Sequence, residues 1–106
     1  MTFYIKQNDT SPSILATLQD ANGVAIDVSG AAVNFYMGNI NGNIVNSTAT
    51  IVDAAAGQVR YDWVALDTAN SGMYQAEFEV IYAGGTKETF PNNDYISVVI
   101  KPDLQD

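Results

Sequence analysis

The sequence predicts an all-β fold, an antiparallel β-sandwich of about seven to nine short strands. Apolar residues alternate with polar residues along most of the chain, whereas the spacing of an amphipathic helix is hard to find. Turn-forming dipeptides such as Asn22-Gly23 and Gly84-Gly85 separate the alternating segments. The length of 106 residues suits one hydrophobic core, so we expect residues 1–106 to form a single domain.

The first half of the chain contains five predicted strands. A β-branched and aromatic run opens the chain, and alternating apolar residues define the next strand. Asn22-Gly23 and Asn41-Gly42 supply the positive-φ residues of two tight turns. Residues 54–57 form a connection, because their three alanines are too few to nucleate a helix. The predicted strands cover residues 2–6, 14–19, 24–26, 33–37 and 44–52.

The second half of the chain alternates more regularly. A predicted strand over residues 58–63 places Trp63 and two other apolar residues on one face. The longest predicted strand covers residues 74–82. One of its faces is apolar, and the other carries Glu77 and Glu79. Two more strands follow at residues 86–90 and 95–101, and Pro102 ends the last one because proline cannot donate to a ladder.

One local pattern narrows the fold to an immunoglobulin-like sandwich. Gly72-Met73-Tyr74 stands at the start of the longest alternating strand. This Gly-x-Tyr pattern is typical of a tyrosine corner, in which the tyrosine hydroxyl bonds to upstream backbone and fixes a crossover between sheets. Ala76 occupies the position that is cysteine in antibody domains. We therefore expect Gly72 and Tyr74 to have a structural role in a sandwich of this architecture.

Composition excludes several classes of partner. The chain carries 12 acidic and 4 basic residues, a net charge of −8. Nucleic acids and anionic membranes are bound by clustered Lys and Arg, so we expect neither as a partner. No stretch approaches the roughly 20 apolar residues of a transmembrane helix. Residues 1–10 lack the apolar core of a signal peptide, so we expect assembly in a cytoplasm.

Nothing in the sequence indicates catalysis. The chain has no cysteine and no histidine, so thiol chemistry and the two commonest zinc ligands are missing. Glu77 and Glu79 lie on the same face of one predicted strand, which we interpret as a solvated outer face. The sequence therefore predicts a protein that is not an enzyme and binds no cofactor.

Calcium is the one metal for which the loops supply candidate ligands. Asn92, Asn93 and Asp94 supply oxygen atoms in one loop, and Asp67 and Asn70 do so in another. Calcium takes about six to eight oxygen ligands, and neither loop has the periodic spacing of an EF-hand. Asn and Asp are also common turn formers. We therefore predict no metal site.

The aromatic residues raise the alternative of a carbohydrate-binding module. Exposed tryptophan and tyrosine rings can stack on sugars, and Trp63 is the obvious candidate. However, Trp63, Tyr61 and Tyr74 lie on the apolar side of their strands, where packing in the core is the better explanation. Three other tyrosines are candidates for surface contacts, namely Tyr4, Tyr36 and Tyr95.

The last predicted strand is apolar on both faces, whereas a strand of an isolated sandwich has one polar face. Either this strand is central and covered, or its outer face meets another subunit. The first and last strands of a sandwich often lie close together, and an open apolar edge calls for a partner. The candidate assembly surface therefore consists of Phe3, Tyr4, Ile5, Tyr95, Ile96, Val98 and Ile100.

Several short motifs occur in a fixed order over nearly the whole chain. They are IKQNDT (residues 5–10), LATLQD (15–20), VSGA (28–31), VNFYM (33–37), VRYDW (59–63), GMYQAEFEV (72–80) and TFPNNDYI (89–96). Each motif alone is weak, but the ordered set resembles the amino-terminal domain of phage baseplate upper proteins.

The resemblance implies an immunoglobulin-like sandwich that docks onto other virion proteins and has no enzymatic activity. We therefore expect a structural protein of a phage virion, made in the host cytoplasm, that acts as an adaptor in tail or baseplate assembly. Its partners would be other virion proteins or further copies of itself. Family members continue into a segment that carries receptor-binding proteins, whereas this chain ends at Asp106. Capsid decoration and, from another class, carbohydrate binding stay open as alternatives.

Overall fold

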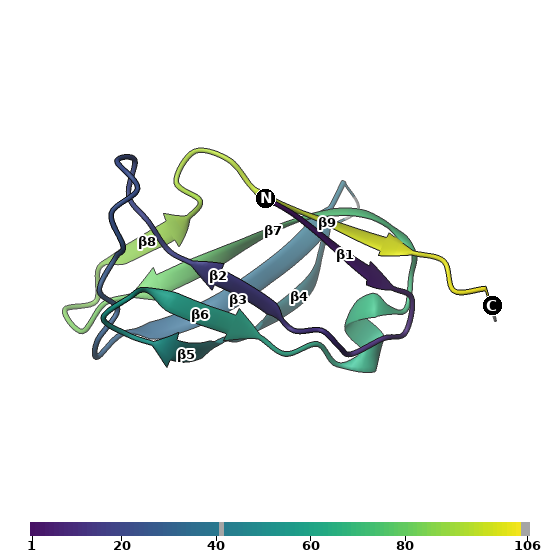
Figure 1. Ribbon diagram of the computed structural model, residues 1–106, viewed down its shortest axis with the longest axis horizontal. Coiled ribbons are helices and arrows are strands. Elements are labelled where there is room, and N and C mark those ends of the chain that lie inside the picture. Colours follow the sequence, from purple (N-terminus) through teal and green to yellow (C-terminus); the bar gives the residue numbers. More distant parts are fainter. Residues whose placement is uncertain (41, 105–106) are drawn as a thin grey trace.

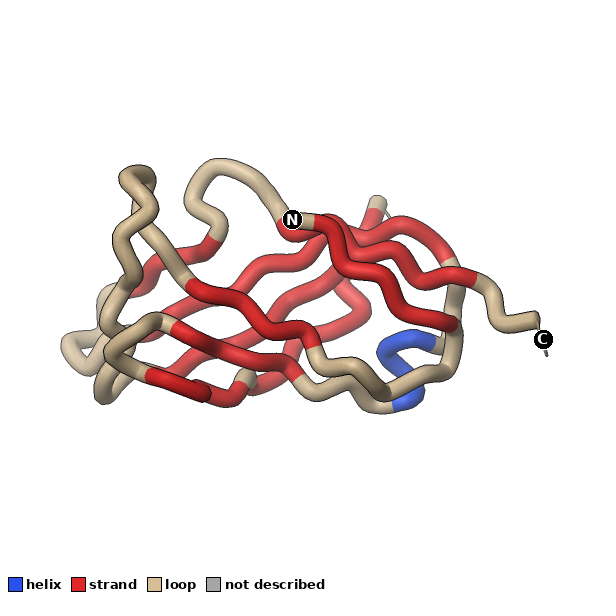
Figure 2. The backbone as a smooth tube through the Cα atoms, viewed as in Figure 1, coloured by secondary structure: helices blue, strands red, loops and turns tan. Residues whose placement is uncertain are grey.

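The computed structural model describes residues 1–40 and 42–104, and within them nine strands form two sheets of a sandwich (Figures 1 and 2). The molecule is elongated, with extents of 45 × 24 × 23 Å. The expected all-β, immunoglobulin-like sandwich is therefore confirmed.

The larger sheet contains six of these strands: β1 (Thr2–Lys6), β3 (Ala32–Asn39), β4 (Gly42–Thr48), β7 (Gly72–Ile81), β8 (Lys87–Phe90) and β9 (Ile96–Lys101). Their order is β1-β9-β7-β3-β4. The first half of β7 pairs with β9, and its second half pairs with β8. β1 runs parallel to β9, which departs from the wholly antiparallel sheet expected from the sequence.

The smaller sheet has three strands in the order β2-β6-β5, with β2 at Ile14–Thr17, β5 at Thr50–Asp53 and β6 at Gln58–Tyr61. A short 3₁₀ helix, η1 (Ala65–Thr68), follows β6 and leads the chain toward β7. No helix is expected from the sequence at this position. Four residues are too few to show helical periodicity, so the pattern gave no signal.

The core lies between the two sheets and is formed by the alternating apolar residues. Phe35 of β3 stacks on Tyr61 of β6, with ring centroids 4.4 Å apart. Its ring also meets Phe78 at 5.0 Å and the edge of Trp63 at 5.6 Å. These four rings join the sheets, which confirms that Tyr61 and Trp63 belong to the core. Trp63 is only 4% exposed, so it offers no platform for a sugar, and the carbohydrate hypothesis in that form is wrong.

Two strand predictions differ from the structure. The single strand expected over residues 44–52 is broken at Ala49, which is buried and donates its N–H to the Val33 carbonyl (2.8 Å). The chain changes sheets there, so β4 and β5 belong to different layers. The short strand expected at residues 24–26 is reduced to one bridge between Ala25 and Gln19. Of the two predicted turns, Asn22-Gly23 is present, whereas Asn41 lies outside the described residues.

The start of β7 has the geometry of a tyrosine corner. The Tyr74 hydroxyl donates to the Asn70 carbonyl at 2.8 Å, and the tyrosine is 6% exposed. Gly72 adopts a φ of +148°, a conformation that L side chains rarely adopt. A Cβ built on Gly72 would make only ordinary contacts with the Tyr74 ring. The backbone conformation, not lack of space, therefore requires glycine here.

We expect Tyr74→Phe to lower the free energy of unfolding by about 0.5–1.5 kcal/mol, the usual net value of one hydrogen bond. Urea melts of the variant and the parent protein measure the difference. Tyr95→Phe is the matched control, because Tyr95 is 48% exposed and its hydroxyl has little burial to lose. Equal midpoints for Tyr74→Phe and the parent protein would show that the corner hydrogen bond does not stabilise the fold.

Candidate docking surface

β1 and β9 lie side by side at one edge of the larger sheet (Figure 1). Their parallel register pairs Phe3 with Val98, Tyr4 with Val99 and Lys6 with Lys101. The strand pairing thus brings most of the candidate assembly residues into one place, and the alternation of faces then divides them into two groups.

Four of the candidate residues are not available to a partner. Ile5, Ile96, Val98 and Ile100 are at most 4% exposed and belong to the core, so their assignment to an assembly surface was wrong. The reason is that β9 is not an edge strand: it lies between β1 and β7, and its apolar face packs inward. Phe3 is half-buried, with its ring 5.8 Å from that of Trp63.

The opposite face of the same strands exposes an apolar row. The register aligns Tyr4 of β1 with Val99 of β9, and Val99 with Met73 of β7. Tyr4 is 59% exposed and Met73 is 76% exposed, while Val99 between them is half-buried. Tyr4 is among the candidates that the sequence indicates, whereas Met73 is not, because the partner strands of β7 leave no local signal in the sequence. Ile40, which is fully exposed, lines a shallow hollow together with Met73.

Positive charge accompanies this row at one end. Lys101 lies over the Tyr4 ring, with its Nζ 5.5 Å from the ring centroid. Lys6 is the register partner of Lys101, so two of the four basic residues of the chain lie next to each other. Tyr4, Met73, Val99 and Lys101 together form what we call the Tyr4–Met73 face.

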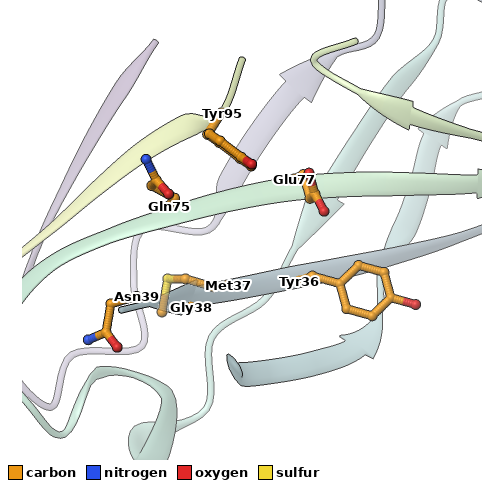
Figure 3. A pocket seen from close by; sticks show the side chains of 7 residues that line it. All are labelled: Tyr36, Met37, Gly38, Asn39, Gln75, Glu77 and Tyr95. Carbon is orange, nitrogen blue, oxygen red and sulfur yellow. The ribbon is translucent and has the colours of Figure 1, made fainter. Parts of the chain in front are cut away.

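Tyr95, the remaining candidate, lies outside this row and lines a separate polar hollow on the same sheet. Figure 3 shows Gln75 and Glu77 on β7 with Tyr95 beside them, and Tyr36 on the neighbouring strand. The Tyr36 hydroxyl donates to Glu79 at 3.0 Å, and burial together with that carboxylate raises the pKa of Tyr36. The hollow therefore has an acidic and amide character that differs from the Tyr4–Met73 face.

One residue of η1 is a buried acid that fixes neighbouring groups. Asp67 is 8% exposed, and its Oδ2 accepts hydrogen bonds from the Tyr61 hydroxyl (2.6 Å) and the Val64 N–H (3.0 Å). Burial, followed by the bond to Asp67, raises the pKa of Tyr61 to about 12. Asp67 is one of the candidate calcium ligands in the sequence, but its carboxylate is engaged in holding Tyr61.

Two of the other loop residues weighed as calcium ligands, Asn92 and Asp94, are also used locally. Asp94 Oδ1 accepts from the Tyr95 N–H, and the Asn92 amide donates to the Thr89 carbonyl, each at 2.8 Å. Within residues 1–40 and 42–104, no group of three or more His, Cys, Asp or Glu residues gathers in a metal-binding arrangement. The helices in this part of the chain include none long and apolar enough to cross a membrane.

The two-sheet fold and its tyrosine corner define an immunoglobulin-like β-sandwich module. The chain belongs to the BppU N-terminal domain family, the amino-terminal domain of phage baseplate upper proteins, whose model matches residues 2–105. The family resemblance inferred from the ordered motifs is confirmed. This family consists of structural, non-enzymatic phage proteins, which makes the chain a structural component of the virion.

Comparison with curated proteins gives no match. Among solved structures, the chain is similar to CopC from Methylosinus trichosporium OB3b, with a TM-score of 0.53 and 12% sequence identity. The match covers 95% of this chain and 84% of CopC. At that identity the likeness concerns the fold alone.

Proposed function

We propose that this domain is an adaptor that attaches to other virion proteins of the phage tail or baseplate through the Tyr4–Met73 face. One observation carries the proposal: Tyr4, Val99 and Met73 form an exposed apolar row across three neighbouring strands. An apolar row on the outer face of a sheet is unfavourable in water unless a partner covers it. The family supplies the class of partner, since baseplate proteins function in contact with other virion proteins.

The residue types in the row suit a protein–protein contact. Tyrosine and methionine are enriched at interfaces, and tyrosine is among the residues that contribute most binding energy. A stable interface buries about 800 Å² on each partner, which is more than one row supplies. The contact would therefore extend to the neighbouring Ile40, which is fully exposed beside Met73.

The rest of the outer face of the larger sheet is more polar. Glu77 and Gln75 line the hollow next to Tyr95, and Glu79 is bonded to Tyr36. We expect this half of the sheet to stay in solvent, as carboxylates are depleted at the centres of interfaces. The family match favours the baseplate and gives no support to capsid decoration.

We expect Met73→Glu to reduce incorporation of the protein into virions by at least about tenfold, because a charge at the centre of an interface is desolvated without a partner. Virions assembled with the variant as the only copy are purified by sedimentation, and the protein is quantified against the capsid protein. Leu66→Glu is the matched control, because Leu66 is 86% exposed on η1, outside the three strands that carry the face. Normal incorporation of a folded Met73→Glu variant would contradict the proposal.

A further inference from the structure

The outer edge of β1 is open to another strand. In the parallel pair with β9, the Met1 carbonyl accepts a hydrogen bond from the Ser97 N–H, and the Gln7 N–H donates to the Lys101 carbonyl. Peptide groups alternate in direction along a strand, so residues 1, 3, 5 and 7 bond to β9. Thr2, Tyr4 and Lys6 therefore direct their backbone N–H and C=O groups away from the sheet. β1 is also the last strand on this side of the sheet.

The loop after β1 leaves this edge accessible. The Lys6 carbonyl accepts a hydrogen bond from the Asp9 N–H at 3.2 Å, so the loop blocks the open edge only at the carboxyl end of β1. Before that point, a hollow opens between β1 and the loop, lined by Tyr4, Lys6, Ser11 and Pro12 among others. Figure 2 shows this loop turning back beneath β1 toward β2. An extended segment that entered this hollow would meet unpaired backbone groups of β1 and an apolar surface to cover.

The charge at the edge indicates the kind of segment. Lys6 and Lys101 are register partners and both line the hollow, whereas Asp9 is the one carboxylate among the residues that line it. This corner is therefore locally positive on a chain of net charge −8. A second copy of the chain would bring the same net charge and another lysine to the edge, which opposes self-pairing.

We infer that the β1 edge receives an extended, acidic segment of another virion protein, which adds to the larger sheet as a further strand beside β1. This inference rests on the proposed function and specifies its partner. Main-chain hydrogen bonds from Thr2, Tyr4 and the Lys6 N–H supply binding that is independent of sequence. The two lysines select for acidic side chains in the added strand.

The backbone part of the inference is tested with Thr2→Pro against Thr2→Ala. Both variants lose the exposed threonine side chain, but only proline removes the N–H that faces the open edge. Proline is tolerated at the first residue of a strand, and matching thermal melts of the two variants verify folding. We expect Thr2→Pro to lower incorporation into virions by about tenfold relative to Thr2→Ala, because it prevents pairing along the edge.

The charge part is tested with Lys6→Glu against Lys87→Glu. Both substitutions change the net charge equally, and Lys87 is exposed on β8, outside the hollow. We expect about tenfold lower incorporation for Lys6→Glu alone, with a smaller difference in high salt. If Met73→Glu blocks assembly while Thr2→Pro and Lys6→Glu assemble like their controls, the docking face stands and the added strand is wrong. A dimer of the free protein that Thr2→Pro dissociates would also overturn the inference, since the edge would then pair with a second copy.

Discussion

Gly57→Ala is expected to destabilise the fold by about 3–5 kcal/mol, among the largest effects of a single methyl group. Gly57 ends the connection between β5 and β6, is buried, and has a φ of +66°. A Cβ on this residue would lie 2.5 Å from the Ile26 carbonyl oxygen and 2.9 Å from that of Leu18. Both atoms are backbone, and Leu18 is tied to Gly57 by a 2.8 Å hydrogen bond, so neither can move without breaking the contact between the segments.

Gly23→Ala separates the steric cost from the conformational cost. Gly23 has a similar φ of +79°, but a Cβ there would have no atom within 4 Å. Its substitution should therefore cost only the roughly 1–2 kcal/mol of placing an L side chain in the left-handed region. Urea unfolding of both variants measures the difference. Equal losses for Gly57→Ala and Gly23→Ala would mean that the close approach to Ile26 has no energetic weight.

Asp67→Ala should cost about 2–4 kcal/mol, because it leaves the buried Tyr61 hydroxyl and the partly buried Val64 N–H without this acceptor. The Tyr61 hydroxyl and the Val64 N–H both bond to the same Asp67 oxygen. If the bond to Tyr61 carries much of this cost, Asp67→Ala will be less damaging in a Tyr61→Phe background, where that donor is gone. Thermal and urea melts of the four proteins in this cycle give the coupling free energy.

Asp62→Ala is the control for the loss of a carboxylate. Asp62 accepts from Ser13 and forms an ion pair with Arg60, but all of these groups are at the exposed surface. Exposed pairs of this kind contribute at most about 1 kcal/mol. A loss as large for Asp62→Ala as for Asp67→Ala would contradict the structural role of the buried acid.

The sequence was sufficient for the fold class because period-two alternation directly reports which face of a strand is buried. Phe35 and Phe78 illustrate this, since each lies in the middle of an alternating run and each is fully buried. The break at Ala49 could not be predicted, because the β-branched residues Thr48, Thr50 and Ile51 around it favour a continuous strand and nothing local marks a change of sheet. The role of Asp67 was equally hidden, as it depends on a tyrosine that comes near only through the turn into η1.

The site could be predicted only in part. The tendency of the first and last strands of a sandwich to lie close together predicted that β1 and the last strand are neighbours, but alternation alone left open which face of each strand points inward. In the structure, the face of β9 that carries Ile96 and Val98 packs into the core, and the opposite face carries Val99. Met73 joins the exposed row because β7 pairs with β9 in one particular register, and a register between distant strands leaves no signal in a single sequence.

Site-specific crosslinking inside assembled virions tests the central claim most directly. A photoreactive phenylalanine analogue is placed at Met73 in one protein and at Leu66 in another, since both side chains are highly exposed and Leu66 lies on η1, outside the strands that carry the face. We expect the probe at position 73 to form a covalent adduct with a different virion protein, which mass spectrometry identifies, and the probe at position 66 to form none. An adduct from position 66 together with none from position 73 would contradict docking through the Tyr4–Met73 face.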